Sequence, residues 1–107
     1  MEIRIFHSNG EGVMRYVISY DIEENQIRTK LSKLLEGYGV RIQYSVFECE
    51  LSEKRFQELY KRIFQLTEGE AGSVRFYSIC KNCVAKIVTI GKPIHELASL
   101  ETDVVVV

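Results

Sequence analysis

The sequence predicts an α+β sandwich, in which two helices cover one face of a β-sheet. Two observations lead to this class: a strand-like apolar run is followed at once by an amphipathic helical pattern, and a second strand–helix succession comes next. Two further strand-like runs follow the second helix. The 107 residues, 46% of them hydrophobic, are enough for one domain with its own core.

The first strand and helix are predicted from residues 15–38. The run from Arg15 to Asp21 is rich in Val, Ile and Tyr, a composition typical of a buried central strand. Apolar side chains then recur at helical spacing, with charged residues between them. This stripe consists of Ile27, Leu31, Leu34, Leu35 and Tyr38. Gly37 and Gly39 supply the signals that end the helix.

Residues 40–51, VRIQYSVFECEL, contain either one kinked strand or two short ones. Apolar residues first occupy the even-numbered positions and then the odd-numbered ones: Val40, Ile42, Tyr44 and Val46, then Phe47, Cys49 and Leu51. Because strand side chains alternate with period two, the phase must slip between Ser45 and Phe47. Periodicity alone does not distinguish a bulge from a tight reversal.

A second helix is predicted to begin after Ser52, which is a good N-cap. Leu51 and Phe56 are spaced to form a hydrophobic staple around this cap. The buried stripe comprises Phe56, Leu59, Tyr60, Ile63 and Leu66. Turn residues in TEGEAGS end the helix, and SVRFYSIC (73–80) and VAKIVTIG (84–91) are predicted as two strands flanking Lys81 and Asn82.

This order of elements, with strands running in both directions, suggests the ferredoxin-like sandwich. Right-handed crossovers place both helices on one face of the sheet, so the other face is left for a partner. We divide the chain into an N-terminal extension (1–13), the ferredoxin-like domain (14–91) and a C-terminal strand or tail (92–107). The tail ends in four valines, which need covering either by a partner protomer or by the chain's own sheet edge.

Composition limits the classes of function. Fourteen basic against fifteen acidic residues give a net charge of -1, so nucleic-acid binding would depend on local patches. Three cysteines exclude a fully paired disulfide framework within one chain and favour a reducing compartment. No apolar run approaches the roughly 18 residues that span a bilayer, and the first residues do not resemble a secretion signal. We therefore expect a cytoplasmic protein without membrane contact.

Asp21 is the candidate chemical group. It lies at the carboxyl end of a predicted strand, at the sheet rim where open α/β folds expose ligand sites. It also precedes a helix, so capping or starting that helix is the simpler interpretation. One carboxylate makes no metal site, but Mg²⁺ is often held by one or two carboxylates with water and substrate phosphate. A two-fold dimer would pair Asp21 with its copy, and such a metal could promote phosphodiester cleavage.

Several segments together resemble the CRISPR-associated Cas2 family. They are YVISYDI (16–22), then Arg28, Lys30 and Leu31, then YGVRIQYSVFECEL (38–51) and SVRFYSIC (73–80), in the order and spacing of that family over about residues 14–91. The resemblance implies a βαββαβ homodimer with a fifth strand and tail that cross to the partner. It also implies two antiparallel strands meeting at residues 43–47. The extension before Met14 departs from the family pattern.

The resemblance implies a function as well. Family members are described as metal-dependent endonucleases on RNA or double-stranded DNA, and Asp21 takes the catalytic, metal-binding position with Mg²⁺ or Mn²⁺ as cofactor. They also form the central dimer that, with the Cas1 integrase, captures new spacers, where the protein acts mainly as a DNA scaffold. A related ferredoxin-like toxin ribonuclease acting without a CRISPR locus is a third possibility.

Further residues are candidates for substrate and dimer contacts. Arg28, Lys30 and Arg41, with Arg75, are candidate phosphate contacts, against the alternative of ordinary solvated charges. Three residues of the matched motifs are candidates for lining the dimer cleft near Asp21: Tyr20, Ser45 and Phe47. For Phe47 the alternative is a core position, and for Ser45 a role in shaping the turn.

Cys80 and Cys83 form a C-x-x-C motif in a predicted turn between strands. Without a second pair this is half a zinc site, and without a following helix it is poorly suited to thioredoxin-type chemistry. We interpret both as structural cysteines, with zinc shared across a dimer as the alternative. His7 and His95 have no partner at metal-binding or catalytic spacing.

Overall fold

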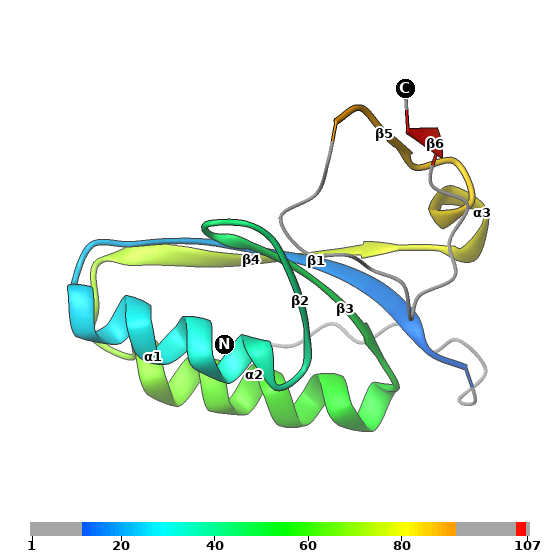
Figure 1. The fold of residues 1–107 in the computed structure, drawn as a ribbon. Helices are drawn as coiled ribbons and strands as arrows, with labels where there is room; N and C mark the ends of the chain where they lie inside the picture. The colour runs from blue at the N-terminus through cyan, green and yellow to red at the C-terminus, as the bar shows by residue number, and fades with distance from the viewer. Residues whose placement is uncertain (1–11, 92–104, 107) are drawn as a thin grey trace.

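The computed structural model describes residues 12–91 and 105–106. The elements are β1 (Met14–Ile22), α1 (Asn25–Glu36), β2 (Gly39–Gln43), β3 (Val46–Leu51), α2 (Glu53–Thr67), β4 (Gly72–Ile79), α3 (Lys81–Val84), β5 (Val88–Thr89) and β6 (Val105–Val106). Figure 1 shows α1 and α2 side by side on one face of the large sheet, with α3, β5 and β6 toward the other face. Within the described ranges, no helix is long and apolar enough to cross a membrane.

The large sheet has the strand order β2-β3-β1-β4, and every neighbouring pair is antiparallel. β1 and β2 run in the same direction but are separated by β3, so strands of both directions occur without a parallel neighbour in this sheet. Both helices pack on one face (Figure 1). The predicted ferredoxin-like βαββαβ sandwich is confirmed.

The core lies between the sheet and the two long helices. Side chains alternate along β1, so Tyr16, Ile18, Tyr20 and Ile22 are buried. They pack with buried residues of β3 and the apolar stripes of the helices, namely Phe47, Cys49, Leu51, Leu31, Leu35, Phe56, Leu59 and Ile63. The two apolar stripes predicted from helical spacing therefore face the sheet.

Both helix starts are capped by side chains. The Ser52 hydroxyl accepts the backbone N–H of Arg55 at 3.2 Å, as predicted, and Leu51 and Phe56 are buried in the same core. At α1 the cap is Glu24, whose carboxylate accepts the N–H of Ile27 at 2.8 Å. The interpretation of Asp21 as the cap of this helix is therefore wrong, because Glu24 already fills that position.

Residues 40–51 form two strands, not one kinked strand. β2 and β3 are antiparallel neighbours joined by a tight reversal at Tyr44 and Ser45, with a register shift between Arg41 and Gln43. The phase slip seen in the sequence is this reversal, because side chains on the two sides of a turn need not keep one parity.

The segment predicted as a strand at 84–91 is largely not one. Lys81–Val84 form the single turn α3, since the carbonyl of Cys80 accepts the N–H groups of Cys83 and Val84 at 3.0 and 2.9 Å. The strand is limited to Val88–Thr89, which pairs in parallel with Val105–Val106. Local helical hydrogen bonds thus replace the expected ladder. The predicted exchange of the tail between protomers concerns a second chain and stays a prediction; residues 1–11 and most of 92–107 lie outside the described ranges.

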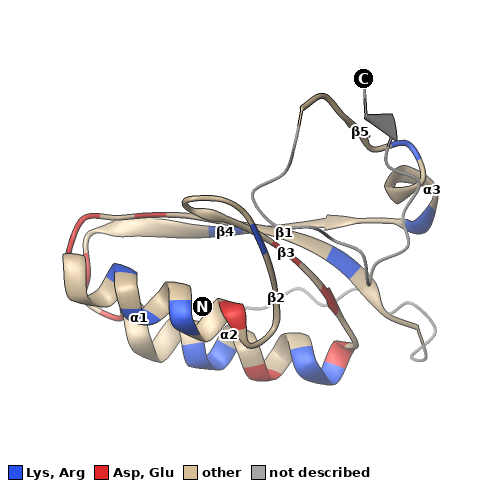
Figure 2. Ribbon diagram, in the orientation of Figure 1, with Lys and Arg blue, Asp and Glu red and all other residues tan. Residues whose placement is uncertain are grey.

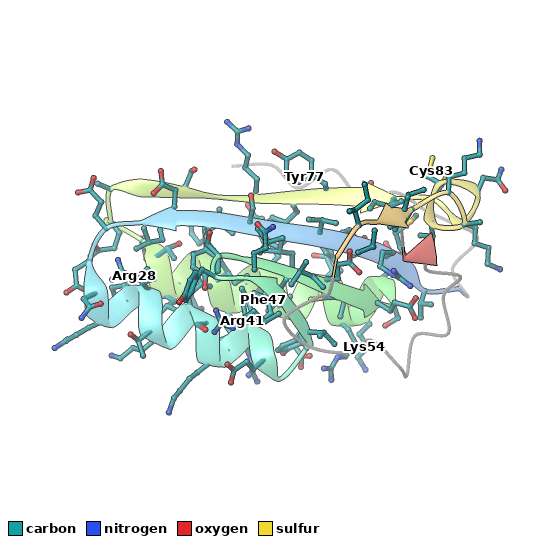
Figure 3. All side chains as sticks on the ribbon, turned by 45° about the horizontal axis from the view of Figure 1, so that its top comes forward. Arg28, Arg41, Phe47, Lys54, Tyr77 and Cys83 are labelled. Atoms are coloured by element: carbon teal, nitrogen blue, oxygen red, sulfur yellow. The ribbon has the colours of Figure 1, made fainter. Side chains whose placement is uncertain are left out.

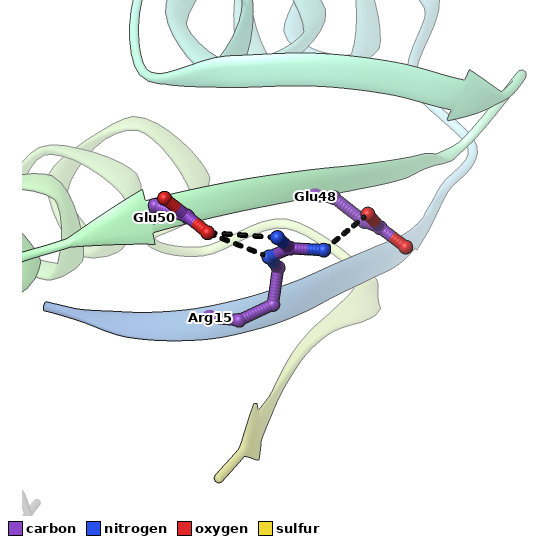
Figure 4. A network of polar contacts seen from close by, with 3 residues as sticks. All are labelled: Arg15, Glu48 and Glu50. Atoms are coloured by element: carbon purple, nitrogen blue, oxygen red, sulfur yellow. Dashed lines mark hydrogen bonds and ion pairs between the residues drawn. The ribbon is translucent and has the colours of Figure 1, made fainter. Parts of the chain in front are cut away.

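Arg15 makes a buried ion-pair network on the sheet face away from the helices. Its guanidinium donates two hydrogen bonds to Glu50 Oε2, at 2.7 and 3.2 Å, and one to Glu48 Oε1 at 3.3 Å (Figure 4). Arg15 lies opposite Glu50 in the β1–β3 register. Because a buried charge is tolerated only when it is paired, these cross-strand contacts fix how β1 and β3 meet.

Candidate functional site

A cleft of about 770 Å³ lies where β1 ends, beside α1 and the β2–β3 turn. It brings together five residues singled out from the sequence: Tyr20, Asp21, Arg28, Arg41 and Ser45. The remaining lining residues are Ile22, Glu23, Thr29, Ser32, Lys33, Glu36 and Tyr44. The cleft thus joins segments that are separated by up to 25 positions in the sequence.

Asp21 is the next-to-last residue of β1; it is exposed and lines this cleft. Among the described residues, its carboxylate has no hydrogen bond or ion pair assigned to it. Its backbone pairs with Ser73 of β4, and the next pair is Ile22 with Gly72. Gly72 has φ +122°, and a Cβ there would lie 2.1 Å from the Asp21 carbonyl oxygen. A glycine at this position therefore lets β4 approach and hold the strand end that presents Asp21.

Tyr20 and Ser45 tie the turn to the strand end. The backbone N–H of Tyr20 donates to the Ser45 carbonyl at 3.1 Å, and the Tyr20 hydroxyl donates to the Tyr44 carbonyl at 3.2 Å. The Tyr20 ring stacks on Phe47, with centroids 6.4 Å apart. Phe47 itself is fully buried and does not line the cleft, so the core interpretation holds for this residue.

Arg41 closes one side of the cleft by connecting β2 to the turn and to α1. Its guanidinium donates to the Tyr44 carbonyl at 2.6 Å and to the Ser32 hydroxyl, and forms an ion pair with Glu36 at 3.4 Å. It also lies over the Phe47 ring, 5.0 Å from the centroid, and both are labelled in Figure 3. The Glu36 carboxylate therefore partly neutralises the charge of Arg41, whose main role is to shape the wall of the cleft.

Arg28 holds the loop that follows Asp21. Its guanidinium donates to the carbonyls of Ile22 and Glu23, at 2.9 and 3.1 Å, and to the Asn25 side chain. These partners are neutral, so the positive charge of Arg28 is not cancelled in the cleft that Asp21 also lines. Lys30 lies on an exposed side of α1 outside the cleft lining, and Figure 2 shows further basic positions along α1 and α2.

Sequence reasoning missed Tyr44. In the alternating pattern of residues 40–46, Tyr44 falls on the same side as Val40 and Ile42. The structure instead places it in the turn between β2 and β3, with 86% of its surface exposed. An aromatic side chain held at the rim of a cleft offers a face on which a base could stack. The phase slip gave part of the signal, because it marked a break next to this residue without distinguishing a bulge from a reversal.

The donor set fits half of a divalent-cation site. The described residues contain no group of three or more His, Cys, Asp or Glu side chains that could hold a metal ion. Asp21 offers one exposed carboxylate, and Mg²⁺ accepts one or two carboxylates when water and phosphate complete its shell. A second Asp21 from another copy of the chain would complete the pair.

Comparison with known proteins identifies the family. Residues 14–87 match the family model described as "CRISPR associated protein Cas2". The chain belongs to the Cas2 family. A relative from Synechocystis named "CRISPR-associated endoribonuclease Cas2 3" is 46% identical over 78 residues, 73% of this chain and 85% of that protein. A Thermus thermophilus relative, "CRISPR-associated endonuclease Cas2 2", is 33% identical over 90 residues, 84% of this chain and 97% of that protein.

Solved structures of Cas2 proteins share this architecture. The crystal structure of Streptococcus pyogenes Cas2 at pH 6.5 has a TM-score of 0.64 and 30% identity, covering 73% of this chain and all of that one. A chain of a partial Cas6-RT-Cas1–Cas2 complex has a TM-score of 0.65 and 36% identity, covering 78% of this chain and 93% of that one. The match to the Cas2 family and its fold agrees with the resemblance found in the sequence.

Proposed function

We propose that this Cas2-family chain is a cytoplasmic homodimer that works in CRISPR adaptation and has divalent-metal-dependent phosphodiesterase capacity. The proposed substrate is RNA or double-stranded DNA, and the proposed cofactor is Mg²⁺ or Mn²⁺. The main support is the placement of Asp21: an exposed carboxylate, without an assigned ion pair, in a cleft that also contains Arg28 and Arg41. The relatives named endoribonucleases or endonucleases support the reaction class.

Each residue has a defined part in this proposal. Asp21 of each protomer would supply a carboxylate ligand to the cation, and backbone pairing with β4 holds the strand segment that carries Asp21. The chemistry supplied by the bound cation is activation of water and stabilisation of the leaving oxygen. Arg28 places positive charge beside the phosphate while fixing the loop after Asp21, and Arg41 holds the turn that carries Tyr44.

Cleavage assays on matched variants test the proposal. Purified full-length protein is incubated with RNA and with duplex DNA, in Mg²⁺, in Mn²⁺ and with a chelator. Asp21→Asn keeps the shape of the side chain but removes its charge, whereas Glu23→Gln removes a neighbouring charge in the same cleft. We expect at least a ~100-fold loss for Asp21→Asn, since a catalytic metal supplies several kcal/mol, and little loss for Glu23→Gln.

Three outcomes would reject the proposed site. The first is equal cleavage by Asp21→Asn and the unchanged protein, and the second is cleavage that persists in chelator. The third concerns the dimer: a monomer by light scattering at the assay concentration would leave Asp21 without its counterpart.

A second candidate function is a scaffold for DNA in a complex with a Cas1 integrase. It is favoured by one observation: a Cas1–Cas2 complex contains a similar chain. On this hypothesis Asp21→Asn still assembles with Cas1 and supports spacer integration. The CRISPR-associated names of the relatives favour both functions over a toxin-type ribonuclease.

A further inference from the structure

Cys80 and Cys83 lie together on a helical turn and away from the cleft. Both side chains are exposed, and Figure 3 shows Cys83 at the opposite end of the molecule from Arg28. Cys80 is the extended N-cap residue of α3 (Lys81–Val84), and Cys83 is the third helical residue. A short helix therefore follows the first cysteine, and the expectation that the motif lacks one is wrong.

The helical turn places the two cysteines next to each other. The N–H of Cys83 donates to the Cys80 carbonyl at 3.0 Å, which closes the chain on itself between the two residues. Residues three apart on such a turn are neighbours, so the two cysteines lie on the same side of it. Both side chains are open to a reagent in solvent.

We propose that Cys80 and Cys83 form a reversible dithiol–disulfide couple that reacts with small disulfides. The inference goes beyond nuclease and scaffold functions and does not depend on either. Zinc binding is less favoured, because the described residues supply no third ligand next to the pair. A purely structural disulfide is also less favoured, because closing so short a loop constrains the unfolded chain less than closing a long one.

The electrostatic surroundings assign different roles to the two sulfurs. The backbone N–H of Cys83, and then its thiol, lower the pKa of the Cys80 thiol, whereas the Cys80 side chain raises the pKa of Cys83. A thiolate is the attacking species, so Cys80 reacts first and Cys83 second. Cys49 is an internal reference, because burial and then Glu48 raise the pKa of its thiol to about 12.

The reaction balances with a disulfide of low molecular weight as the oxidant. The Cys80 thiolate attacks one sulfur of this disulfide, forming a mixed disulfide and releasing the first small thiolate. Cys83 then loses its proton and attacks the Cys80 sulfur, so that the Cys80–Cys83 bond forms and the second small thiolate leaves. The protein loses two electrons and two protons, and the oxidant becomes two thiols.

Redox titration of the full-length protein tests this couple. The reduced protein is equilibrated with mixtures of oxidised and reduced glutathione, quenched by alkylation and analysed by peptide mass spectrometry. We expect a loss of about 2 Da, located to one linked peptide pair, that a thiol reductant reverses. Cys83→Ser should accumulate the mixed disulfide at Cys80, whereas Cys49→Ser should titrate like the unchanged protein.

The same experiment contains the results that would overturn the proposal. These are the absence of any Cys80–Cys83 link across the glutathione range, a link between two chains, or a link that includes Cys49. Retention of zinc that protects both thiols from alkylation would also overturn it. Circular dichroism of each serine variant checks that the fold is kept, so failure to react cannot be attributed to unfolding.

Discussion

The Arg15 network gives the sharpest test of the energetics of this fold. The perturbation is a double-mutant cycle: Arg15→Met, which keeps an apolar stem, Glu50→Gln, which keeps the side-chain shape, and the combination. Arg15 has a 3% exposed side chain and two hydrogen bonds to Glu50, whose side chain is 37% exposed. The cycle therefore measures a pair with one buried and one partly exposed partner.

The expected magnitude follows from this geometry. Hydrogen bonds to charged groups contribute about 1.5–3 kcal/mol, and partial exposure of Glu50 reduces that figure through solvent screening. We expect a coupling free energy of about 1–2 kcal/mol for the Arg15–Glu50 pair. The matched control is Arg55–Glu58 on α2, where the atoms are 3.8 Å apart and the side chains are 52% and 46% exposed. Its coupling should stay below about 0.5 kcal/mol.

Urea unfolding followed by circular dichroism measures both cycles. Protein concentration is held fixed, because the stability of a dimer depends on it. If the Arg15–Glu50 coupling is no larger than the Arg55–Glu58 coupling, burial of the Arg15 guanidinium does not stabilise the β1–β3 pairing, and the reasoning fails.

Three further predictions concern the strand end, the cleft rim and the buried thiol. Gly72→Ala should lower the free energy of unfolding by at least about 2 kcal/mol, and Gly69→Ala by about 1 kcal/mol, because both have positive φ but only at Gly72 would a Cβ clash; equal losses in urea unfolding would contradict this. Tyr44→Ala should weaken RNA binding about 5- to 150-fold if one base stacks there, and Tyr44→Phe should not; fluorescence anisotropy tests the pair, and identical affinities would exclude stacking. Burial raises the pKa of the Cys49 thiol from 9.0 to about 12, so its stabilising contribution is complete below about pH 9 and is lost as the pH rises toward 12. Unfolding between about pH 8 and about pH 10.5 should therefore lose less free energy in Cys49→Ala than in the unchanged protein, and equal losses would refute the assignment.

Part of the candidate site was predictable from local pattern. The strand composition before Asp21 and the helical spacing after it fixed that aspartate at a strand end beside α1, because both signals depend on neighbouring residues. The phase slip at 45–47 likewise marked a break close to Tyr44, and the structure shows that this break is a reversal. The sequence could not show that Arg28 and Arg41 are engaged by carbonyls of their own chain, since those partners meet only after folding.

By itself, the sequence determined the positions of β1, α1, α2 and β4, the two helix stripes and the family of the chain, all of which depend on side-chain periodicity and local motifs. Only the tertiary structure decided three things: that Glu24 caps α1, that Arg15 is buried between Glu48 and Glu50, and that a helical turn joins Cys80 to Cys83. The cap and the turn depend on which of several nearby partners a polar group finds, and hydrophobic periodicity does not record that choice. The Arg15 network depends on burial and on contacts between strands that are distant in the sequence.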